Sequence, residues 1–362
     1  MIRRMDEDRE PSTTSGTIAV VNLHAQIEGL AVRVPGTAPG AATAERSTLI
    51  DLLTLRGHVL GRIADYERAA DLAEQLVRGT RDIGRQDNAP QSNAMRGSAT
   101  QDNSPQGNAP HNNTTPDEGT ALLARARTRA TFHRFAEALA DLDDAERSGL
   151  DRAVLAAERA VILQALGCHA QAEQLHCAAA KGRPDFSTLG GLAVLHAERG
   201  EVAEAERLFT EARRRYRGTS PFPLASLDYR RGLMWFRAGN LTAARIWFDA
   251  GRRRVPAYAP ALGHLAEIDA ALGDHRAAID RLRPLASVSD DPAYAASLAC
   301  ALSAAGRHRE AEYWRASAAA RYEDLTLRHP DAYADHAADF RRRTTVSHPT
   351  SLSAQPAGSR PT

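Results

Sequence analysis

Two cysteines and two histidines form the only metal-like cluster in this chain. They are Cys168, His169, His176 and Cys177. Thiolates and imidazoles are good zinc ligands, and structural zinc sites draw them from a few characteristic spacings. The separation of these four residues along the chain matches none of the spacings known for zinc sites. We therefore expect ordinary packed cysteines and surface histidines, with no bound metal and no cofactor.

Two runs of three arginines are the second chemical feature. They lie at Arg213–Arg215 and Arg252–Arg254, and both close a predicted helix. Cations at that position complement the partial negative charge of a helix C-terminus, at about 0.3–1 kcal/mol each. The alternative is an edge that binds an acidic partner or RNA phosphate. Because no aromatic residues interleave with the runs for base stacking, we favour the first interpretation and expect no nucleic-acid partner.

Composition narrows the class of protein further. The formal net charge of +1 gives no whole-chain attraction to nucleic acid or to an anionic membrane. The first residues lack the apolar core of a signal peptide, and no run approaches the roughly 20 apolar residues of a membrane helix. Three cysteines are too few for a disulfide framework. We expect a cytoplasmic protein, and the arginine- and alanine-rich composition is typical of a GC-rich bacterial genome.

Local catalytic motifs are absent from the sequence. It contains no phosphate-binding loop, dinucleotide fingerprint, metalloprotease helix or nucleophile elbow. These signals are short and local, so their absence argues against the corresponding enzymes. We expect a protein that is not an enzyme, although a site built from scattered residues would escape this search.

A repeating pattern positions all of these residues. An alanine recurs at steps of 34, 33, 39, 34 and 33 residues, and a glycine precedes five of the six alanines by five positions. The alanines are Ala138, Ala172, Ala205, Ala244, Ala278 and Ala311, and the glycines are Gly167, Gly200, Gly239, Gly273 and Gly306. A helical hairpin that cannot bury its apolar face alone must stack on copies of itself. The repeats therefore predict the fold.

The clearest copy of the pattern spans 225–258. It has small, aromatic, glycine, small, aromatic and proline positions, namely Gly232, Trp235, Gly239, Ala244, Phe248 and Pro256. This order resembles the tetratricopeptide repeat (TPR), whose period is 34 residues. Asp228 stands where the family has an aromatic residue earlier in the first helix. The resemblance implies an all-α protein, a right-handed α-solenoid of about six to seven TPR-like hairpins.

The pattern also divides the chain into segments. Polar, duplicated sequence within Gln86–Pro116 can bury almost nothing and should not fold. We expect a partly disordered segment at 1–48 with a helix at 17–34, a degenerate first hairpin at 49–83, a disordered insertion at 84–118, the TPR array at 119–328, a capping helix at 329–343 and a disordered tail at 344–362. The frames within the array are 119–152, 153–185, 186–218, 225–258, 259–291 and 292–325.

Three local expectations concern the ends of the array. An apolar stripe on the first helix is predicted from Ile18, Val21, Ala25 and Leu30. In the first hairpin, we expect Ala64 to replace the turn glycine, because it precedes Ala69 by five positions. Near the C-terminus, Tyr333 and Phe340 should lie on the repeat at 292–325.

In the TPR family, the first helix of each repeat lines a concave groove, with positions 2, 5, 9, 12 and 13 pointing inward. Carried onto this sequence, the resemblance implies a protein-binding groove formed by Arg127, Gln164, Glu198, Tyr229, Leu233, Phe236, Arg237 and Glu267. Tyr229, Phe236 and Arg237 are of the residue types enriched in binding hot spots. The alternative is that Leu233 and Phe236 simply pack against the neighbouring repeat.

The function that this fold favours is a non-catalytic scaffold that binds a protein or peptide along the groove. Two alternatives stay open. One is a regulatory or sensor module of a bacterial signalling or transcription system, detached from its output domains. The other is an enzyme with a dispersed site.

Overall fold

The computed structural model describes residues 11–34, 39–87, 116–180 and 184–346. Every regular element in these ranges is an α-helix. None of the helices described there is long and apolar enough to cross a membrane. Most of the expected insertion, at 88–115, and the tail beyond 346 lie outside the described residues.

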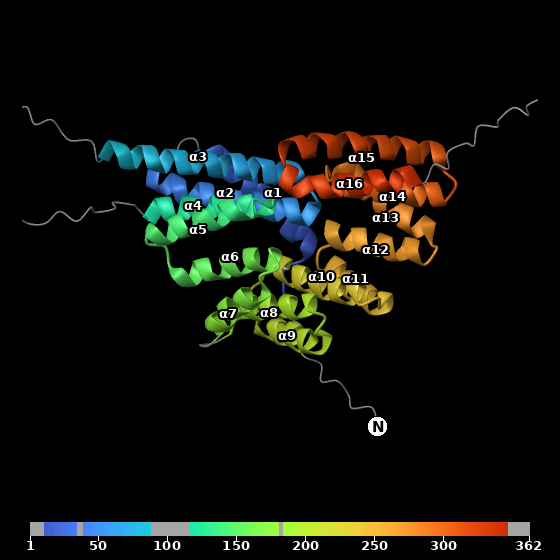
Figure 1. Cartoon of the computed structure of the whole chain (residues 1–362), viewed down its shortest axis with the longest axis horizontal. Coiled ribbons are helices and arrows are strands. Elements are labelled where there is room, and N and C mark those ends of the chain that lie inside the picture. Colours follow the sequence, from blue (N-terminus) through green and yellow to red (C-terminus); the bar gives the residue numbers. More distant parts are fainter. Residues whose placement is uncertain (1–10, 35–38, 88–115, 181–183, 347–362) are drawn as a thin grey trace, which may run out of the picture.

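Seven helical hairpins follow one another along the described chain, flanked by α1 (Gly16–Arg33) and α16 (Pro330–Val346). The hairpins are α2 (Pro39–Leu60) with α3 (Ile63–Asp87), α4 (Pro116–Thr131) with α5 (Phe135–Arg147), α6 (Arg152–Ala165) with α7 (His169–Ala180), α8 (Phe186–Glu198) with α9 (Val202–Arg215), α10 (Phe222–Arg237) with α11 (Leu241–Arg254), α12 (Ala259–Ala271) with α13 (His275–Val288), and α14 (Pro292–Ala304) with α15 (His308–Arg328). This arrangement confirms the predicted all-α solenoid of TPR-like hairpins (Figure 1).

The turn inside each hairpin of the array has a left-handed backbone. All five predicted turn glycines have φ between +75° and +82°. Residues other than glycine rarely adopt this conformation because their Cβ crowds the backbone. The repeat at 119–152 nevertheless places His133 there, with φ of +59°, five residues before Ala138. The turn geometry therefore follows the predicted frame even where glycine is missing.

Small residues set the distance between the two helices of a hairpin. Ala244 on α11 and Phe248 one turn later are fully buried. A Cβ added to Gly232 on α10 would lie 2.6 Å from a ring carbon of Phe248. The aromatic ring thus occupies the space that a side chain at Gly232 would need.

The first hairpin differs from the prediction at its turn. The left-handed residue is Gly61, with φ of +65°, and Ala64 lies inside α3. The expected turn at Ala64 was therefore wrong by about one helical turn. The physical reason is a contact with a residue more than 200 positions later in the chain. The Asp290 carboxylate accepts hydrogen bonds from the Ile63 N–H at 2.5 Å and from the Ala64 N–H at 2.8 Å. These contacts fix the start of α3 as a capped helix N-terminus.

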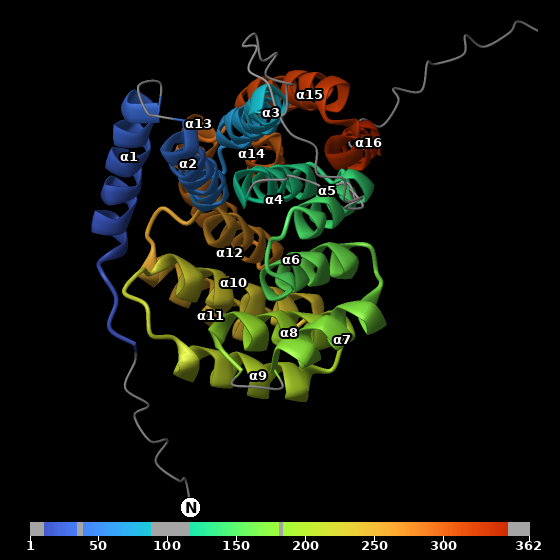
Figure 2. The same cartoon turned by 90° about the vertical axis from the view of Figure 1, so that its left-hand side faces the viewer.

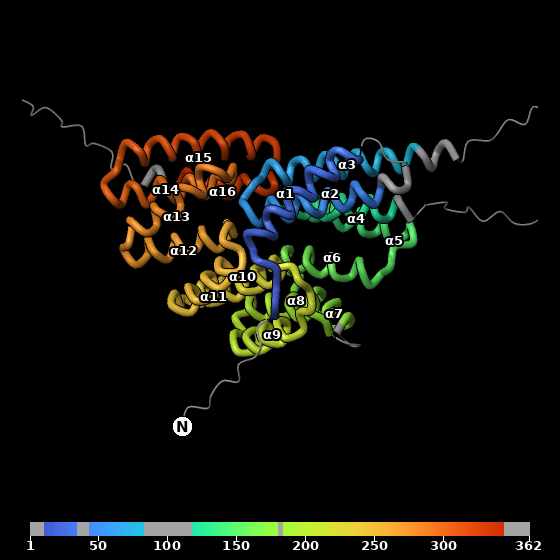
Figure 3. Tube along the Cα trace, turned by 180° about the vertical axis from the view of Figure 1, so that it is seen from behind, coloured from blue at the N-terminus to red at the C-terminus, as the bar shows by residue number. Residues whose placement is uncertain are grey.

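Helix α1 presents a different face from the predicted one. Its buried side chains are Ala19, Leu23, Ile27 and Leu30, whereas Ile18 and Val21 are exposed. The predicted stripe was wrong except for Leu30, because α1 packs on α2 while its first turn rests on the end of α11. Gly16 lies directly against the Arg254 backbone, where a side chain would collide. Figure 3 shows α1 crossing between these parts of the molecule.

Seen along its longest axis, the array makes one turn around a common centre, and we call this turn the ring because its two ends lie side by side and touch (Figures 1 and 2). Figure 2 shows α4, α8 and α10 nearer the centre of the ring than α5, α9 and α11. The beginning and end of the array meet: His58 on α2 lies 2.7 Å from the Tyr258 hydroxyl, and Glu67 on α3 contacts Arg328 at the end of α15. We call this contact between the first hairpin and the repeats from α12 onward the seam.

Helix α16 continues the array beyond the last hairpin. It packs against α15, where the rings of Phe340 and Tyr322 lie 5.2 Å apart. It also extends to Val346, so the three arginines Arg341–Arg343 belong to the helix. The expected contact of Phe340 with the 292–325 repeat is therefore present, on a helix longer than predicted.

The first prediction tests the helix contact at Ala244. Changing Ala244→Leu should lower the free energy of unfolding by about 1–3 kcal/mol, because the buried site has no room for three more carbons. Ala320→Leu, on the exposed face of α15, is the control and should change stability little. Thermal unfolding measures the effect. If Ala244→Leu and Ala320→Leu both melt at the temperature of the parent protein, the repeat frame is wrong.

The second prediction concerns His58 at the seam. Burial, followed by the nearby charge of Arg230, lowers the pKa of His58 from its usual 6.5 to about 4. The folded protein therefore favours the neutral ring, and stability is fully present above pH 6.5 and falls as the pH drops from 6.5 to 4. The loss should be on the order of 3 kcal/mol at most.

Urea unfolding of the wild type and of His58→Gln over this pH range measures the effect. Glutamine can keep a hydrogen bond to Tyr258 and does not titrate. The difference in stability between the two proteins should therefore change with pH. Parallel curves would contradict a neutral His58 ring at the seam.

Candidate functional site: the concave groove

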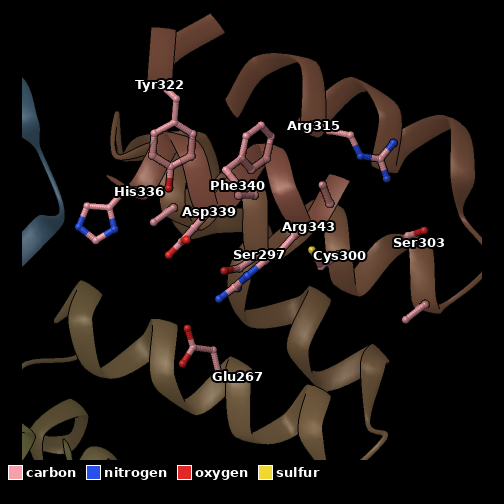
Figure 4. Close-up of a pocket in the computed structure, with 14 residues that line it drawn as sticks. Glu267, Ser297, Cys300, Ser303, Arg315, Tyr322, His336, Asp339, Phe340 and Arg343 are labelled. Atoms are coloured by element: carbon pink, nitrogen blue, oxygen red, sulfur yellow. The ribbon is translucent and has the colours of Figure 1, made fainter. Parts of the chain in front are cut away.

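A hollow of about 540 Å³ lies on the concave side of the last repeats. Helix α14 forms its floor, Glu267 of α12 lies on one side, and α15 and α16 form the opposite wall. Figure 4 shows Glu267 on its own helix, facing Arg343 and Ser297. The hollow is thus lined by four helices of the last repeats, α12, α14, α15 and α16.

The floor of the hollow follows the predicted frame. Positions 2, 5, 9, 12 and 13 of the repeat at 292–325 all line it, and they are Ala293, Ala296, Cys300, Ser303 and Ala304. Sequence reasoning selected larger inward-facing side chains and named none from this repeat. The repeat frame could have predicted this hollow, because a stripe of small residues at inward positions leaves space in a groove.

Charged groups surround this floor in pairs. Glu267 lies 2.8 Å from the His264 ring nitrogen, and Arg315 and Arg342 pair with Glu312 and Asp339. Burial raises the pKa of Tyr322 to about 12, so its hydroxyl stays protonated and can donate a hydrogen bond. The hollow therefore combines an apolar floor with hydrogen-bonding groups of both signs at its edge.

The predicted groove residues of the earlier repeats form bridges between neighbouring first helices. The Arg127 guanidinium donates to Glu158 at 2.8 Å and to Asp51 at 3.2 Å, linking α4 to α6 and α2. Gln164 donates to Glu198 at 2.9 Å, linking α6 to α8. These contacts place Arg127, Gln164 and Glu198 at the repeat junctions.

The aromatic group on α10 packs inside the array. The Tyr229 ring contacts Phe248 and Tyr258, and both Tyr229 and Phe236 lie beside His264 of α12, with ring centroids 5.6 Å and 5.3 Å apart. Burial raises the pKa of Tyr229 to about 12. Leu233 is half-buried against the same cluster, so the structure favours the alternative of packing against the neighbouring repeat for Leu233 and Phe236.

Of the eight predicted groove residues, only Glu267 lines the hollow. Arg237 is exposed at the end of α10. A second apolar stretch lies on α6, where Val154 and Val161 occupy inward positions 2 and 9 and are 46% and 58% exposed. The concave surface is thus accessible over α6 and over α14.

The cysteine–histidine cluster is arranged differently from the prediction. No group of three or more metal-ligating side chains occurs within the described ranges. His176 is buried, whereas Cys168 and Cys177 are exposed, so the expectation of packed cysteines and surface histidines was wrong for these three. His176 is buried because Gly191 on α8 has no side chain and so leaves room for the imidazole ring.

The two arginine runs meet at one buried carboxylate. Asp228 accepts hydrogen bonds from Arg213 at 3.1 Å and from Arg254 at 2.6 Å. This role explains why Asp228 stands where the TPR pattern has an aromatic residue. Further along the runs, Arg215 pairs with Glu211 and Arg252 with Asp249. The geometry favours a structural ion-pair network over a surface for phosphate.

The third prediction tests whether the hollow is truly empty space. Ala296→Phe places a ring in the hollow and should leave the melting temperature nearly unchanged. Ala301→Phe, on the buried face of the same helix, should cost about 1–3 kcal/mol by overpacking. If Ala296→Phe destabilises the protein as much as Ala301→Phe, the floor of α14 is packed and no groove exists there.

Comparison with known proteins gives similarity at the level of structure. No protein-family model and no curated protein matches the chain. A TPR protein from Parabacteroides merdae is 16% identical, with a TM-score of 0.48, and the match covers 78% of this chain and 99% of that one. The type IV pilus biogenesis factor PilW is 18% identical, with a TM-score of 0.45, over 59% and 94% of the two chains. PilF from Pseudomonas aeruginosa is 15% identical, with a TM-score of 0.43, over 63% and 99%.

Proposed function

We propose that this protein is a non-catalytic scaffold that binds a protein or peptide in its concave groove, at the hollow over α14. The single observation that carries the proposal is that hollow, of about 540 Å³, with a floor of small residues. Its volume lies within the range of roughly 300–1,000 Å³ that is typical of ligand pockets in proteins.

The chemistry of the hollow supports a peptide ligand. Alanine, serine and cysteine side chains on α14 let a bound backbone approach closely, while Tyr322 and Phe340 offer aromatic contact area. Arg343 and Glu267 lie on opposite sides of the hollow, so charges of both signs border it. The arginine runs are engaged with carboxylates, which supports a protein partner rather than nucleic acid.

A non-catalytic role is part of the proposal. The His264 ring is held by Glu267 of the same helix, and the sequence carries no local catalytic motif. The exposed thiols of Cys168, Cys177 and Cys300 fit a reducing compartment, so we propose a cytoplasmic location.

The fourth prediction tests the groove with two matched variants. Peptides selected from a random displayed library on the immobilised protein should bind the wild type and lose about tenfold or more in affinity on Cys300→Trp, because the indole fills the hollow. Cys168→Trp makes the same chemical change at an exposed turn outside the hollow and is the control. Unfolding curves verify that both variants fold.

Two outcomes would contradict the proposal. One is a library that yields no binders to the wild type. The other is selected peptides that bind Cys300→Trp as tightly as they bind the wild type. In the second case the protein would still bind peptides, but at a surface other than this hollow.

A further inference from the structure

The seam that closes the ring has two parts of different chemistry. In its apolar part, Val59 of α2 is buried in one cluster with Val255 and Tyr258, which precede α12. In its polar part, the start of α3 meets the loop before α14 and the end of α15. Both parts join the same two arms of the ring, α1–α5 and the chain from Val255 through α16.

The polar part consists mainly of hydrogen bonds and ion pairs. Asp290 accepts from the first two N–H groups of α3, and Glu67 contacts Arg328 and the His329 ring nitrogen, the latter at 3.1 Å. The Arg328 side chain is 40% exposed. One ring contact accompanies these bonds, between His329 and Phe132. The Glu67 side chain beside Arg328 is 19% exposed, and ion pairs that water still reaches contribute little net stability. Val59, Val255 and Tyr258 in the apolar part are at most 1% exposed, so the polar part should open first.

A second hollow, of about 200 Å³, lies within the polar part of the seam. Thr131 and His133 line it from the N-terminal arm, and Tyr333 lines it from the C-terminal arm. Ala293, Tyr322 and His336 line both this hollow and the larger one over α14. The space between the arms is therefore adjacent to the groove, and the two share a wall.

We propose that the polar part of the seam is a clasp that opens while the apolar part holds, so that the two arms separate at α3 and α15. When the arms separate, the smaller hollow between them opens, and the larger hollow over α14 becomes accessible from that side as well. The arms stay joined at Val59, Val255 and Tyr258, which act as the hinge. The use of this movement for ligand entry rests on the proposed function of the groove, whereas the movement itself does not.

The test uses Cys300, which lies in the larger hollow, as a reporter. In a background with Cys168→Ser and Cys177→Ser, the rate of Cys300 modification is measured with small N-ethylmaleimide and with a bulky polymer-linked maleimide. The clasp variant combines Asp290→Ala with Glu67→Gln. The control combines Asp274→Ala, which removes a cap local to α13, with Glu310→Gln, which removes an ion pair to Arg283.

The bulky reagent should react about tenfold faster with the clasp variant than with the parent, the change expected when hydrogen bonds to charged groups are lost. The small reagent should react at the same rate with every protein, and the control should match the parent with both reagents. Unchanged bulky-reagent rates in the clasp variant would overturn the clasp. Equal acceleration in the control would overturn it too, because general loosening would then explain the access. No peptide enters the measurement, so a failure of the proposed function is a separate result.

Discussion

The close approach of two helices at a buried small residue is the contact on which the rest of this structure depends. Ala244 is fully buried against the partner helix, and the Phe248 ring fills the space beside Gly232. A left-handed turn at Gly239 brings the two helices together. Each hairpin formed in this way keeps an apolar side that only another hairpin can cover, so stacking follows from the same contact.

Stacking has a second consequence when the array curves far enough for its ends to meet. The chain then places an N-terminal hairpin against repeats that follow it by more than 200 residues, as in the contact of Ile63 with Asp290. Closure leaves the inner faces of the first helices around a common centre (Figure 2). Where those faces carry large side chains, as at Tyr229, they pack inside the array, and where they carry small ones, as at Ala296, a hollow remains.

Much of the fold could be predicted from the sequence because its signals are local and repeated. The spacing of glycine and alanine fixed the frame, and His133 adopts the turn backbone that the frame requires. The errors arose where distant parts of the chain meet: Asp290 sets the start of α3, the end of α11 sets the face of α1, and Gly191 makes room for His176. The groove was only partly predictable, because the frame names inward positions but not whether the neighbouring repeat fills them.

The distance between the two ends of the array tests the central claim, a closed ring of stacked hairpins, most directly. Spin labels attached at Arg68 on α3 and Leu327 on α15, both exposed, would report it by pulsed electron resonance in solution. A closed ring predicts a dominant short distance, that of two helices in contact. A broad distribution at long distances, with no short component, would show an open superhelix and contradict the account.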